Sequence, residues 1–441
     1  MTSPTFPDFS IQRLGEPRIK SPIALGSTDN DGLADFVRDE NRVAYGIDVS
    51  VGEASLPIGS RGLLEKAGPR ELIYFDPSKV RAGIVTCGGL CPGLNNVIRA
   101  AVMTLWYGYG VRQICGIRYG YRGLLPELQM PVKELTPDVV SDIHRFGGTM
   151  LGASRGGGDR IAAMVDAMEQ LNLSVLFAIG GDGTQRGAEA LAAEIARRHN
   201  RMAVVGIPKT IDNDLSFVER SFGFETAVSR AVESVQAAHV EARGSIDGIC
   251  IVKVMGRESG FIAAHTALAT NDVNFLLVPE VPFHLEGENG LLAHLDRRMS
   301  TRHHAVVVTA EGAGQELVES SGQDASGNKK LGDIGLFLRD RIGKYFADKG
   351  QEITLKYIDP SYIIRAAPAN PTDAIYCARL GANAVHAAMS GRTNCLVGLV
   401  NHRLVHVPIS LATQHRNRVN PESPLWRDVI EATGQPRMRN T

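Results

Sequence analysis

The chain has 441 residues, of which 44% are hydrophobic and 22% charged, and its formal net charge is −1. A chain of this length is expected to form roughly two or three domains with sizeable cores. The near-zero net charge argues against nucleic acid and membrane surfaces as partners, and no uncharged apolar run of about 18 residues predicts a membrane span.

The cysteines and the N-terminal residues give two further exclusions. Cys87 and Cys91 have the spacing of half a zinc site, but no second pair supplies the other ligands, so we do not expect zinc there. The six cysteines are too few and too scattered for a disulfide framework. The first twenty residues lack the basic start and apolar run of a signal peptide, which predicts a cytoplasmic protein.

In chain order, residues 1–80 are rich in Pro, Gly and charge and have no sustained periodicity. We expect an N-terminal extension that covers the body or is ordered by an oligomer contact. From residue 81, short apolar runs alternate with glycine-rich turns and stretches of helical spacing, as in RAGIVTCGG, VLFAIGGDGTQRGAEALAAEIARR, MAVVGIPKTIDND, DGICIVKVMGRESGFIAAHTALA and HHAVVVTAEGAGQ. This alternation predicts an α/β fold with parallel sheets, helices on both faces and ligands at the carboxyl ends of the strands.

Three glycine-rich turns are candidate phosphate sites: Gly88-Gly89, Gly147-Gly148 leading to 156–158, and Gly180-Gly181-Asp182-Gly183-Thr184. Missing side chains let phosphates reach backbone N–H groups, and the following helix N-terminus adds a favourable dipole. Neither GxxxxGK[ST] nor GxGxxG occurs, which argues against a Walker A loop and a dinucleotide-binding oxidoreductase. A carboxylate in a phosphate turn indicates bridging magnesium. The alternative is a helix N-cap, formed by Asp182 or Thr184.

The pentapeptide Thr210-Ile211-Asp212-Asn213-Asp214 follows a predicted strand. One of its carboxylates could accept a proton from an attacking sugar hydroxyl while the other supports a metal or neighbouring cations. An Asx-rich turn is the alternative interpretation. Cations near other strand ends fit a phosphorylated substrate, although each could equally be a solvated surface charge; they are Arg155, Arg160, Lys209, Arg257 and Arg365.

These segments, in this order, resemble the 6-phosphofructokinases. The resemblance spans about residues 81–400 and rests on GGLCPGLN, GGTMLGASR, GGDGTQRGAEAL, PKTIDND, FGFETAVSRAVE, VKVMGRESGFIA, PEVPF, AEGAGQ and SYIIRAAPANPTDA. The set is most similar to the branch that holds the plant and trypanosomatid ATP-dependent enzymes. NAD and lipid kinases share a GGDGT-like turn but should lack PKTIDND and VKVMGR.

The resemblance implies transfer of a phosphoryl group from Mg-ATP to the 1-hydroxyl of fructose 6-phosphate. It implies two Rossmann-like α/β domains with the active site between them, and a homo-oligomer, dimer or tetramer. The expected divisions are an extension at 1–80, a nucleotide-phosphate domain at 81–223 rejoined by about 364–400, a sugar-phosphate domain at 224–363 and a C-terminal tail at 401–441.

The resemblance also implies residue roles. Asp212 would be the general base, with Arg155, Thr210 and Asp214 as further catalytic residues, and Asp182 would organise magnesium. The nucleotide would contact Gly88, Arg155, Gly181, Asp182, Gly183 and Thr184. The sugar phosphate would contact Thr210, Asp212, Met255, Gly256, Arg257, Glu311, Lys356, Tyr362 and Arg365. Three positions depart from the short bacterial enzymes, because Gly248 and Lys356 replace arginines and Tyr362 replaces a histidine.

Two residues bear on the phosphoryl donor. Gly183 is typical of ATP users, since an aspartate there would crowd and repel the α-phosphate, whereas Lys209 is typical of pyrophosphate users. The plant and trypanosomatid branch combines this glycine and lysine with ATP, so we predict ATP, with a pyrophosphate-dependent enzyme as the alternative. A non-catalytic nucleotide-binding subunit on the same fold is a remote alternative, because Asp182 and Asp212 are both intact.

Overall fold

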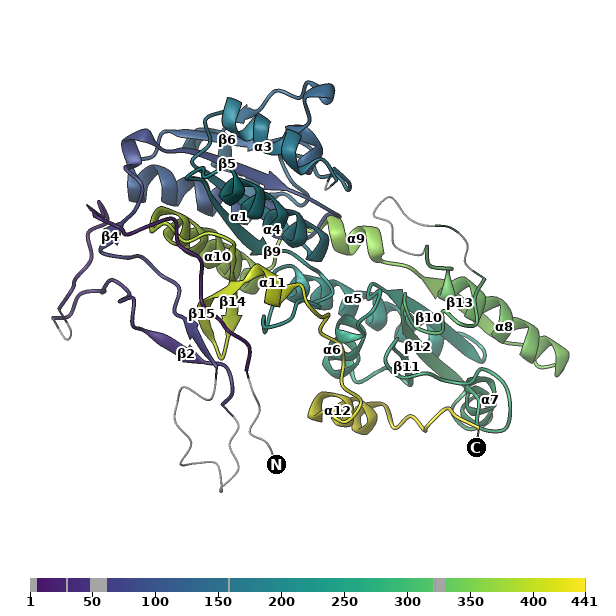
Figure 1. Cartoon of the computed structure of the whole chain (residues 1–441). Helices are drawn as coiled ribbons and strands as arrows, with labels where there is room; N and C mark the ends of the chain where they lie inside the picture. The colour runs from purple at the N-terminus through teal and green to yellow at the C-terminus, as the bar shows by residue number, and fades with distance from the viewer. Residues whose placement is uncertain are drawn as a thin grey trace. The chain divides into compact units, whose positions relative to one another are not determined.

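The computed structural model describes residues 6–28, 31–47, 62–157, 159–319, 322 and 330–440. The chain divides into two compact units (Figure 1). Unit 1 comprises Met1–Thr210, Leu215–Gly223 and Pro368–His415. Unit 2 comprises Ile211–Asp214, Phe224–Ala367 and Arg416–Thr441.

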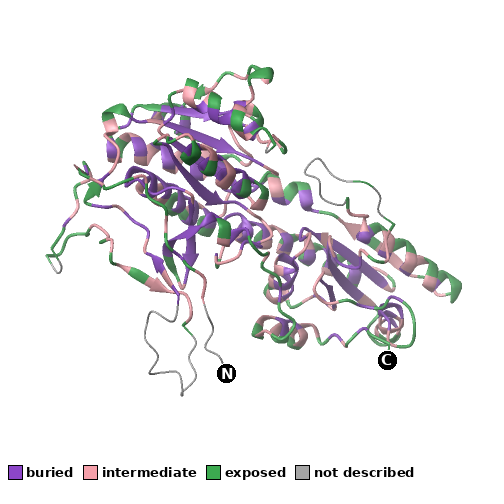
Figure 2. Cartoon of the chain, viewed as in Figure 1, coloured by how far each residue is buried: buried purple, intermediate pink, exposed green. Residues whose placement is uncertain are grey.

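The described part of unit 1 is built on a seven-stranded sheet in the order β15-β14-β9-β8-β5-β6-β7. All its neighbouring strands are parallel except the two edge pairs, in which β15 and β7 run antiparallel to β14 and β6. The strands are β5 (Arg81–Thr86), β6 (Gln113–Ile117), β7 (Lys133–Glu134), β8 (Val175–Gly180), β9 (Ala203–Pro208), β14 (Cys395–Val400) and β15 (Arg403–Pro408). The central strands are buried, as continuous apolar runs such as VLFAIG predict (Figure 2).

Helices cover both faces of this sheet. Leu176 and Ala178 of β8 pack in one core with Met164 and Leu191, which come from α3 (Ile161–Gln170) and α4 (Asp182–Arg197). The alternate residues of β8 point to the opposite face, where α1 (Leu94–Met103) and α10 (Pro371–Met389) pack together and α10 packs on β9. A π-helical turn, Thr104–Tyr109, continues α1, and the short helices α2 (Pro137–Val140) and α11 (Ile409–Ala412) complete the unit.

The described part of the N-terminal extension packs on unit 1. Its short strands form two antiparallel pairs, β1 (Ile19–Lys20) with β4 (Leu72–Ile73) and β2 (Arg42–Ala44) with β3 (Leu63–Glu65). The buried guanidinium of Arg392 lies 2.6 Å from Glu65 and 2.8 Å from Asp39, while Arg13 contacts both carboxylates at 2.8 Å. These ion pairs join the extension to the turn between α10 and β14.

The described part of unit 2 contains a four-stranded parallel sheet in the order β11-β12-β10-β13. The strands are β10 (Gly248–Val254), β11 (Phe275–Leu277), β12 (His304–Ala310) and β13 (Thr354–Ile358). Cys250 and Val252 face a core with α5 (Phe224–Gly244), α6 (Phe261–Thr270) and α12 (Pro424–Thr433). Ile249 and Ile251 face a second core with α7 (Leu291–Arg302) and α8 (Ile334–Asp348). The helix α9 (Ser361–Ala366) follows β13.

The predicted α/β class, with largely parallel sheets and helices on both faces, is therefore confirmed. The segment 401–441, expected as a C-terminal tail, contains β15 and α11 of unit 1 and α12 of unit 2. The location of the active site between two domains stays a prediction.

Candidate active site

The glycine turn after β5 lies among the other predicted donor segments of unit 1. The backbone N–H of Gly88 donates to the carbonyl of Ser154 at 3.0 Å, which brings the Arg155 segment beside this turn. The Lys209 ammonium donates to the carbonyl of Gly89 at 2.8 Å. Gly88 has a φ of 84°, and an added Cβ would lie 3.3 Å from the Lys209 Nζ. A side chain at residue 88 would therefore be strained and would crowd the lysine.

The helix α4 begins at the carboxyl edge of the same sheet. Gly181 is its N-cap, and the carbonyl of Gly181 accepts from the Thr184 N–H at 2.9 Å, so the predicted nucleotide residues 181–184 form the first turn. The side chain of Asp182 is mostly buried and forms an ion pair with Arg186, one turn along the helix. A Cβ added at Gly183 would meet no atom within 4 Å. The first turn therefore leaves open space at residue 183.

The two arginines predicted between β6 and α3 differ in their surroundings. Arg155 is exposed in the glycine-rich stretch before α3. Arg160 forms an exposed ion pair with Glu127 at 2.6 Å, and no predicted site residue takes part in that pair. Arg155 remains the better placed candidate for a phosphate contact.

Asp212 is partly buried among polar groups of unit 2. Its Oδ2 accepts from the Arg257 N–H at 3.4 Å, and its carbonyl accepts from the Ser259 hydroxyl at 2.9 Å. Within the described chain, the buried Oδ1 of Asp212 has no hydrogen-bond partner. Burial, followed by the negative charges of Asp214 and Glu311, raises the pKa of Asp212 well above its ordinary value. A buried acceptor without a partner is costly unless a ligand or water satisfies it.

Asp214 lies beside Asp212 in sequence but has a separate partner. Its carboxylate is 3.6 Å from Arg416, and its carbonyl accepts from the Asn417 N–H at 2.8 Å. Arg416 also lies 3.2 Å from Glu258. Asp214 therefore ties the TIDND segment to the segment that leads toward α12.

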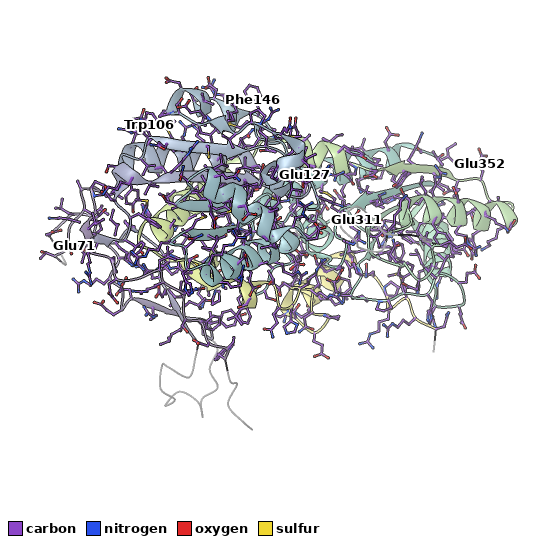
Figure 3. The ribbon with its side chains drawn as sticks, turned by 45° about the horizontal axis from the view of Figure 1, so that its top comes forward. Glu71, Trp106, Glu127, Phe146, Glu311 and Glu352 are labelled. Carbon is purple, nitrogen blue, oxygen red and sulfur yellow. The ribbon has the colours of Figure 1, made fainter. Side chains whose placement is uncertain are left out.

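The ends of β10 and β12 meet around the predicted sugar residues. The Glu311 N–H donates to the carbonyl of Val254 at 2.9 Å, and the Gly312 N–H donates to that of Gly256 at 3.0 Å. Burial raises the pKa of Glu311, against the opposing charges of Lys253, Arg257 and Arg365. Figure 3 shows Glu311 well separated within unit 2 from Glu352. Glu352 precedes β13 and so lies at the amino end of the parallel strands, whereas Glu311 follows the carboxyl end of β12. The carboxyl edge thus gathers Met255, Gly256, Arg257 and Glu311.

Three further predicted sugar-phosphate residues lie on β13 and α9. Arg365 is half-buried on α9, with its Cζ 5.0 Å from the ring centroid of Tyr362, and Tyr362 is 79% exposed. Lys356 is exposed on β13 and pairs in register with Cys250, four residues before the end of β10. At about 3.3 Å per residue, that register places its backbone roughly 13 Å from the carboxyl edge. The structure therefore brings Arg365 toward Glu311 at the carboxyl edge but does not bring the backbone of Lys356 there.

The position of Gly248 explains one departure from the bacterial pattern. A Cβ at residue 248 would lie 2.2 Å from the Ala242 carbonyl oxygen. No arginine fits at this position without a shift of the α5–β10 turn.

The predicted site residues divide between the units at the TIDND segment, because Thr210 belongs to unit 1 and Asp212 and Asp214 belong to unit 2. Unit 1 holds the predicted donor residues Gly88, Arg155, Gly181, Asp182, Gly183, Thr184 and Lys209, together with Thr210, which was predicted as a catalytic and sugar-binding residue. Unit 2 holds the other predicted site residues. Among the described residues, no group of three or more His, Cys, Asp or Glu side chains could hold a metal ion. Of the helices in the described ranges, none has both the length and the apolar character needed to cross a membrane.

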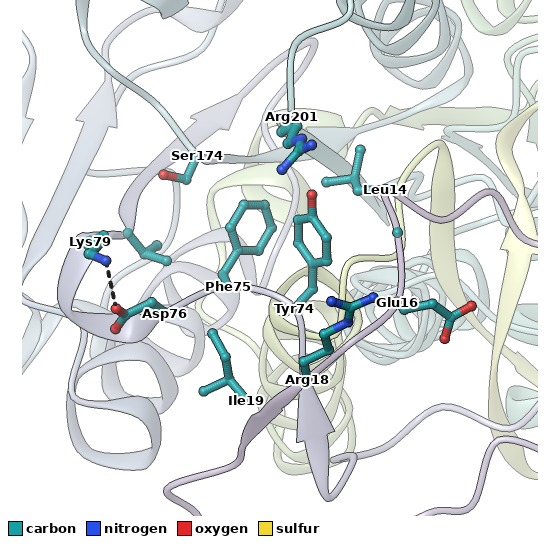
Figure 4. Close-up of a pocket in the computed structure, with 12 residues that line it drawn as sticks. Leu14, Glu16, Arg18, Ile19, Tyr74, Phe75, Asp76, Lys79, Ser174 and Arg201 are labelled. Atoms are coloured by element: carbon teal, nitrogen blue, oxygen red, sulfur yellow. Dashed lines mark ion pairs between the residues drawn. The ribbon is translucent and has the colours of Figure 1, made fainter.

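A surface pocket of about 600 Å³ in unit 1 contains none of the predicted site residues (Figure 4). The rings of Tyr74 and Phe75 line it, together with Arg18, Ser174 and Arg201. Ser174 and Arg201 precede β8 and β9, so the pocket lies at the amino edge of the strands, away from the glycine turns. We therefore assign the candidate site to the carboxyl edge.

The family model described as Phosphofructokinase matches residues 81–388, which include the glycine turns, TIDND, Arg257, Glu311 and Arg365. The chain belongs to the phosphofructokinase family. An ATP-dependent 6-phosphofructokinase of Borreliella burgdorferi is 52% identical to the chain over 97% of each protein.

Members of the same family from plants and trypanosomatids are also similar, as the motifs predict. The ATP-dependent 6-phosphofructokinase 7 of Arabidopsis thaliana is 49% identical over 86% of this chain and 78% of its own. The corresponding Trypanosoma cruzi enzyme is 48% identical over 86% and 79%. A solved pyrophosphate-dependent phosphofructokinase from Marinobacter aquaeolei is similar in fold, with a TM-score of 0.65 and 20% identity over 80% of this chain and 91% of that one.

Sequence patterns missed three residues that shape this phosphofructokinase-family site: Arg186, Lys253 and Arg416. Arg186 lies four residues after Asp182 in a predicted helix, and that spacing alone could have indicated the pair. Lys253 stands in the VKVMGR motif, but the resemblance assigns only Met255, Gly256 and Arg257 of that motif to the sugar site. Arg416 is about 200 residues from Asp214, and no local pattern indicates their contact.

Proposed function

We propose that this chain is an ATP-dependent 6-phosphofructokinase, which transfers the terminal phosphoryl group of Mg-ATP to the 1-hydroxyl of fructose 6-phosphate. The observation that carries the proposal is the buried, unpartnered Oδ1 of Asp212, beside the strand-end residues Arg257 and Glu311. An attacking hydroxyl would satisfy that oxygen by donating its hydrogen, in the geometry that general-base catalysis requires.

The raised pKa of Asp212 supports its role as the base. A carboxylate of ordinary pKa is a weak base, and burial strengthens it. When the hydroxyl attacks the phosphorus, its proton passes to Asp212. Arg257 and Glu311 then orient the sugar, with the Arg257 N–H holding Oδ2 so that Oδ1 faces the substrate.

We assign the donor phosphates to the glycine turns of unit 1. The backbone around Gly88 and the first turn of α4, from Gly181 to Thr184, offer N–H groups and a helix dipole. Arg155 would reach the transferring phosphoryl group, and Thr210 and Asp214 would complete the catalytic residues. Transfer requires the donor and acceptor residues to act on one phosphoryl group.

Asp182 fits a magnesium ion that is held mainly by substrate. Magnesium usually keeps several waters and binds one or two carboxylates together with phosphate oxygens, so a single protein carboxylate suffices. Bound magnesium would offset the negative charge on the donor phosphates. Arg186 now partners this carboxylate and would compete with the ion.

Arg365 and Tyr362 are the residues of α9 that we assign to the 6-phosphate. A guanidinium suits a doubly charged phosphate, and the exposed hydroxyl of Tyr362 can donate one hydrogen bond. The register of Lys356 puts its backbone far from this group, so its role in the site is the weakest of the sugar-phosphate assignments.

The pyrophosphate-dependent reaction is the second candidate, and Lys209 favours it. Its ammonium lies at the Gly88–Gly89 turn, where it could neutralise a compact donor. The open space at Gly183 favours ATP instead, because a nucleotide needs room beyond its β-phosphate. We therefore keep ATP as the proposed donor and propose a homo-oligomer as the working assembly.

The test is product formation by the purified chain. With Mg-ATP and fructose 6-phosphate, fructose 1,6-bisphosphate and ADP should appear in equal amounts. Asp212→Asn should abolish most of this product while still binding fructose 6-phosphate. If Asp212→Asn turned over as fast as the wild type, Asp212 would not be the general base.

A further inference from the structure

Lys253 is a partly buried cation on the face of β10 that packs against α8. Its neighbours on that face, Ile249 and Ile251, are fully buried, and the Lys253 side chain is 12% exposed. The ammonium lies 2.8 Å from Asp333 Oδ2 and 3.0 Å from Asp359 Oδ2. It therefore bridges two carboxylates that are 26 residues apart in sequence.

Each of these carboxylates also holds the start of a helix. Asp333 is the N-cap of α8, and its Oδ1 accepts from the Leu336 N–H at 3.1 Å. Asp359 accepts from the Ser361 N–H at 3.0 Å and from the Ser361 hydroxyl, and Ser361 is the first residue of α9. Lys253 thus holds both helix starts against β10, an inner strand of the sheet.

The two helices differ in what they carry. The helix α9 is one and a half turns long and presents Tyr362 and Arg365, the residues assigned above to the 6-phosphate. The helix α8 is longer and packs by Ile334, Leu338 and Ile342 into a core of its own. A helix as short as α9 has little intrinsic stability, so its position depends on its contacts, which are the packing of the buried Ile364 and the ion pair of Asp359 with Lys253. The contact through Asp359 is therefore the one with a functional consequence.

Lys253 also lies close to Glu311, one of the predicted sugar-binding residues. Its charge, with those of Arg257 and Arg365, acts on the partly buried Glu311 carboxylate and lowers its pKa. No second ammonium contacts Asp333 or Asp359 within the described ranges, so loss of Lys253 would leave two partly buried carboxylates facing each other. Their repulsion would push the start of α9 away from β10.

We propose that Lys253 is a positioning residue for the sugar-phosphate site: through Asp359 it fixes α9, and thereby Arg365, against the 6-phosphate. The inference rests on the proposed function. It assigns Lys253 no contact with substrate.

The experiment compares Lys253→Met, Asp359→Asn and Asp333→Asn with Arg365→Ala as the reference. Met keeps the length of the apolar stem but lacks the charge. Lys253→Met and Asp359→Asn should raise the KM for fructose 6-phosphate roughly tenfold, the effect of one charged hydrogen bond, with kcat and the KM for ATP little changed. Asp333→Asn should lower the melting temperature without that rise in KM. Lys253→Arg should restore part of the affinity.

The thermal shift induced by fructose 6-phosphate gives a second readout that needs no turnover. It should shrink in Lys253→Met and Asp359→Asn and persist in Asp333→Asn. Equal KM values in wild type, Lys253→Met and Asp359→Asn, with a raised KM in Arg365→Ala, would overturn the positioning role and leave the proposed function intact. A wild-type chain that neither binds nor phosphorylates fructose 6-phosphate would overturn both.

Discussion

The carboxylate of Asp182 accepts a hydrogen bond from the guanidinium of Arg186, one turn further along α4. Arg186 also donates to the carbonyl of Thr413 at 3.2 Å, so its side chain has a second anchor. The proposed magnesium ligand is thus paired with a cation of its own helix. Mg-ATP must share or replace that partner.

This pairing predicts how two variants respond to magnesium. Asp182→Ala should raise the magnesium and ATP concentrations needed for half-maximal rate, because no carboxylate remains to hold the metal. Arg186→Ala should lower the magnesium requirement, since the competing cation is gone. Arg197→Ala, which removes the Glu194 pair at the far end of the same helix, is the matched control and should change neither. A magnesium titration that is identical in all three variants would show that Asp182 does not bind the metal.

Substitution of Asp212 should lower kcat much more than it weakens substrate binding. Asp212→Ser is expected to lower kcat by roughly two to four decades, the usual share of general acid–base catalysis, while both substrates still bind. The comparison is kcat from initial rates against the Kd of fructose 6-phosphate from calorimetry. Near-normal kcat in a folded variant would leave Asp212 as a turn residue only.

The raised pKa of Asp212 predicts the acid side of the pH profile and a stability effect. Asp212 must be ionised to act as the base, so kcat/KM should fall as the pH is lowered. Because the pKa of Asp212 is raised, the midpoint of that fall should lie above the ordinary aspartate pKa of about 4. Between that value and the folded-state pKa, the folded chain binds more protons than the unfolded chain, so this group's contribution to stability falls as pH rises. Asp212→Asn should therefore raise the melting temperature relative to wild type, more at pH 8 than at pH 5. A constant difference across that range would contradict the raised pKa.

The ion cluster of Arg392, Glu65 and Asp39 should govern the attachment of the N-terminal extension. Burial alone would raise the pKa of both carboxyls, but hydrogen bonds and the charge of Arg392 lower both pKa values below their ordinary range. Arg392→Met would leave the buried Glu65 carboxylate with fewer neighbouring cations. Removal of one partner of a buried ion pair lowers the free energy of unfolding by about 3–5 kcal/mol.

The readout is the melting temperature, with the exposed Arg427→Ala as control. The stabilisation should be present above pH 4 and be lost as the pH falls through the lowered pKa values. An unchanged melting temperature in Arg392→Met would mean that the cluster contributes little.

Much of the fold followed from local pattern. The run VLFAIG became β8, and the glycine turn after it opened α4, because a buried parallel strand and a helix start both have strong local signals. The sheet order and the return of β14 beside β9 depend on contacts between distant residues, which no local pattern specifies.

The same distinction holds for the site. Asp212, Arg257 and Glu311 lie on separate motifs, and the resemblance to the 6-phosphofructokinases implied that they belong to one site. Their contact through β10 and β12 then follows from the parallel sheet. The Arg416 and Lys253 partnerships depend on distant segments, so sequence alone did not reveal them, whereas the four-residue spacing of Asp182 and Arg186 could have indicated their pair. Lys356 differs from these residues, because strand register puts its backbone far from the carboxyl edge, and its role in the site stays a prediction.

Gly183 should favour ATP as the donor because it adds neither volume nor negative charge beside the α-phosphate. A Cβ added at residue 183 meets no atom within 4 Å, so Gly183→Asp should fold normally. Its carboxylate would face the α-phosphate, and like charges about 4 Å apart cost a few kcal/mol at a partly buried site. ATP-dependent turnover should fall by roughly two decades while the KM for fructose 6-phosphate changes little. Gly183→Ala, which adds volume without charge, separates the two effects. A Gly183→Asp variant that uses ATP normally would contradict this assignment.

The most direct measurement is the rate of fructose 1,6-bisphosphate formation by the wild-type chain, with ATP and with pyrophosphate as alternative donors under the same magnesium and fructose 6-phosphate concentrations. We predict rapid product formation with ATP and none above background with pyrophosphate. Turnover with pyrophosphate and not with ATP would show that Lys209, rather than Gly183, identifies the donor.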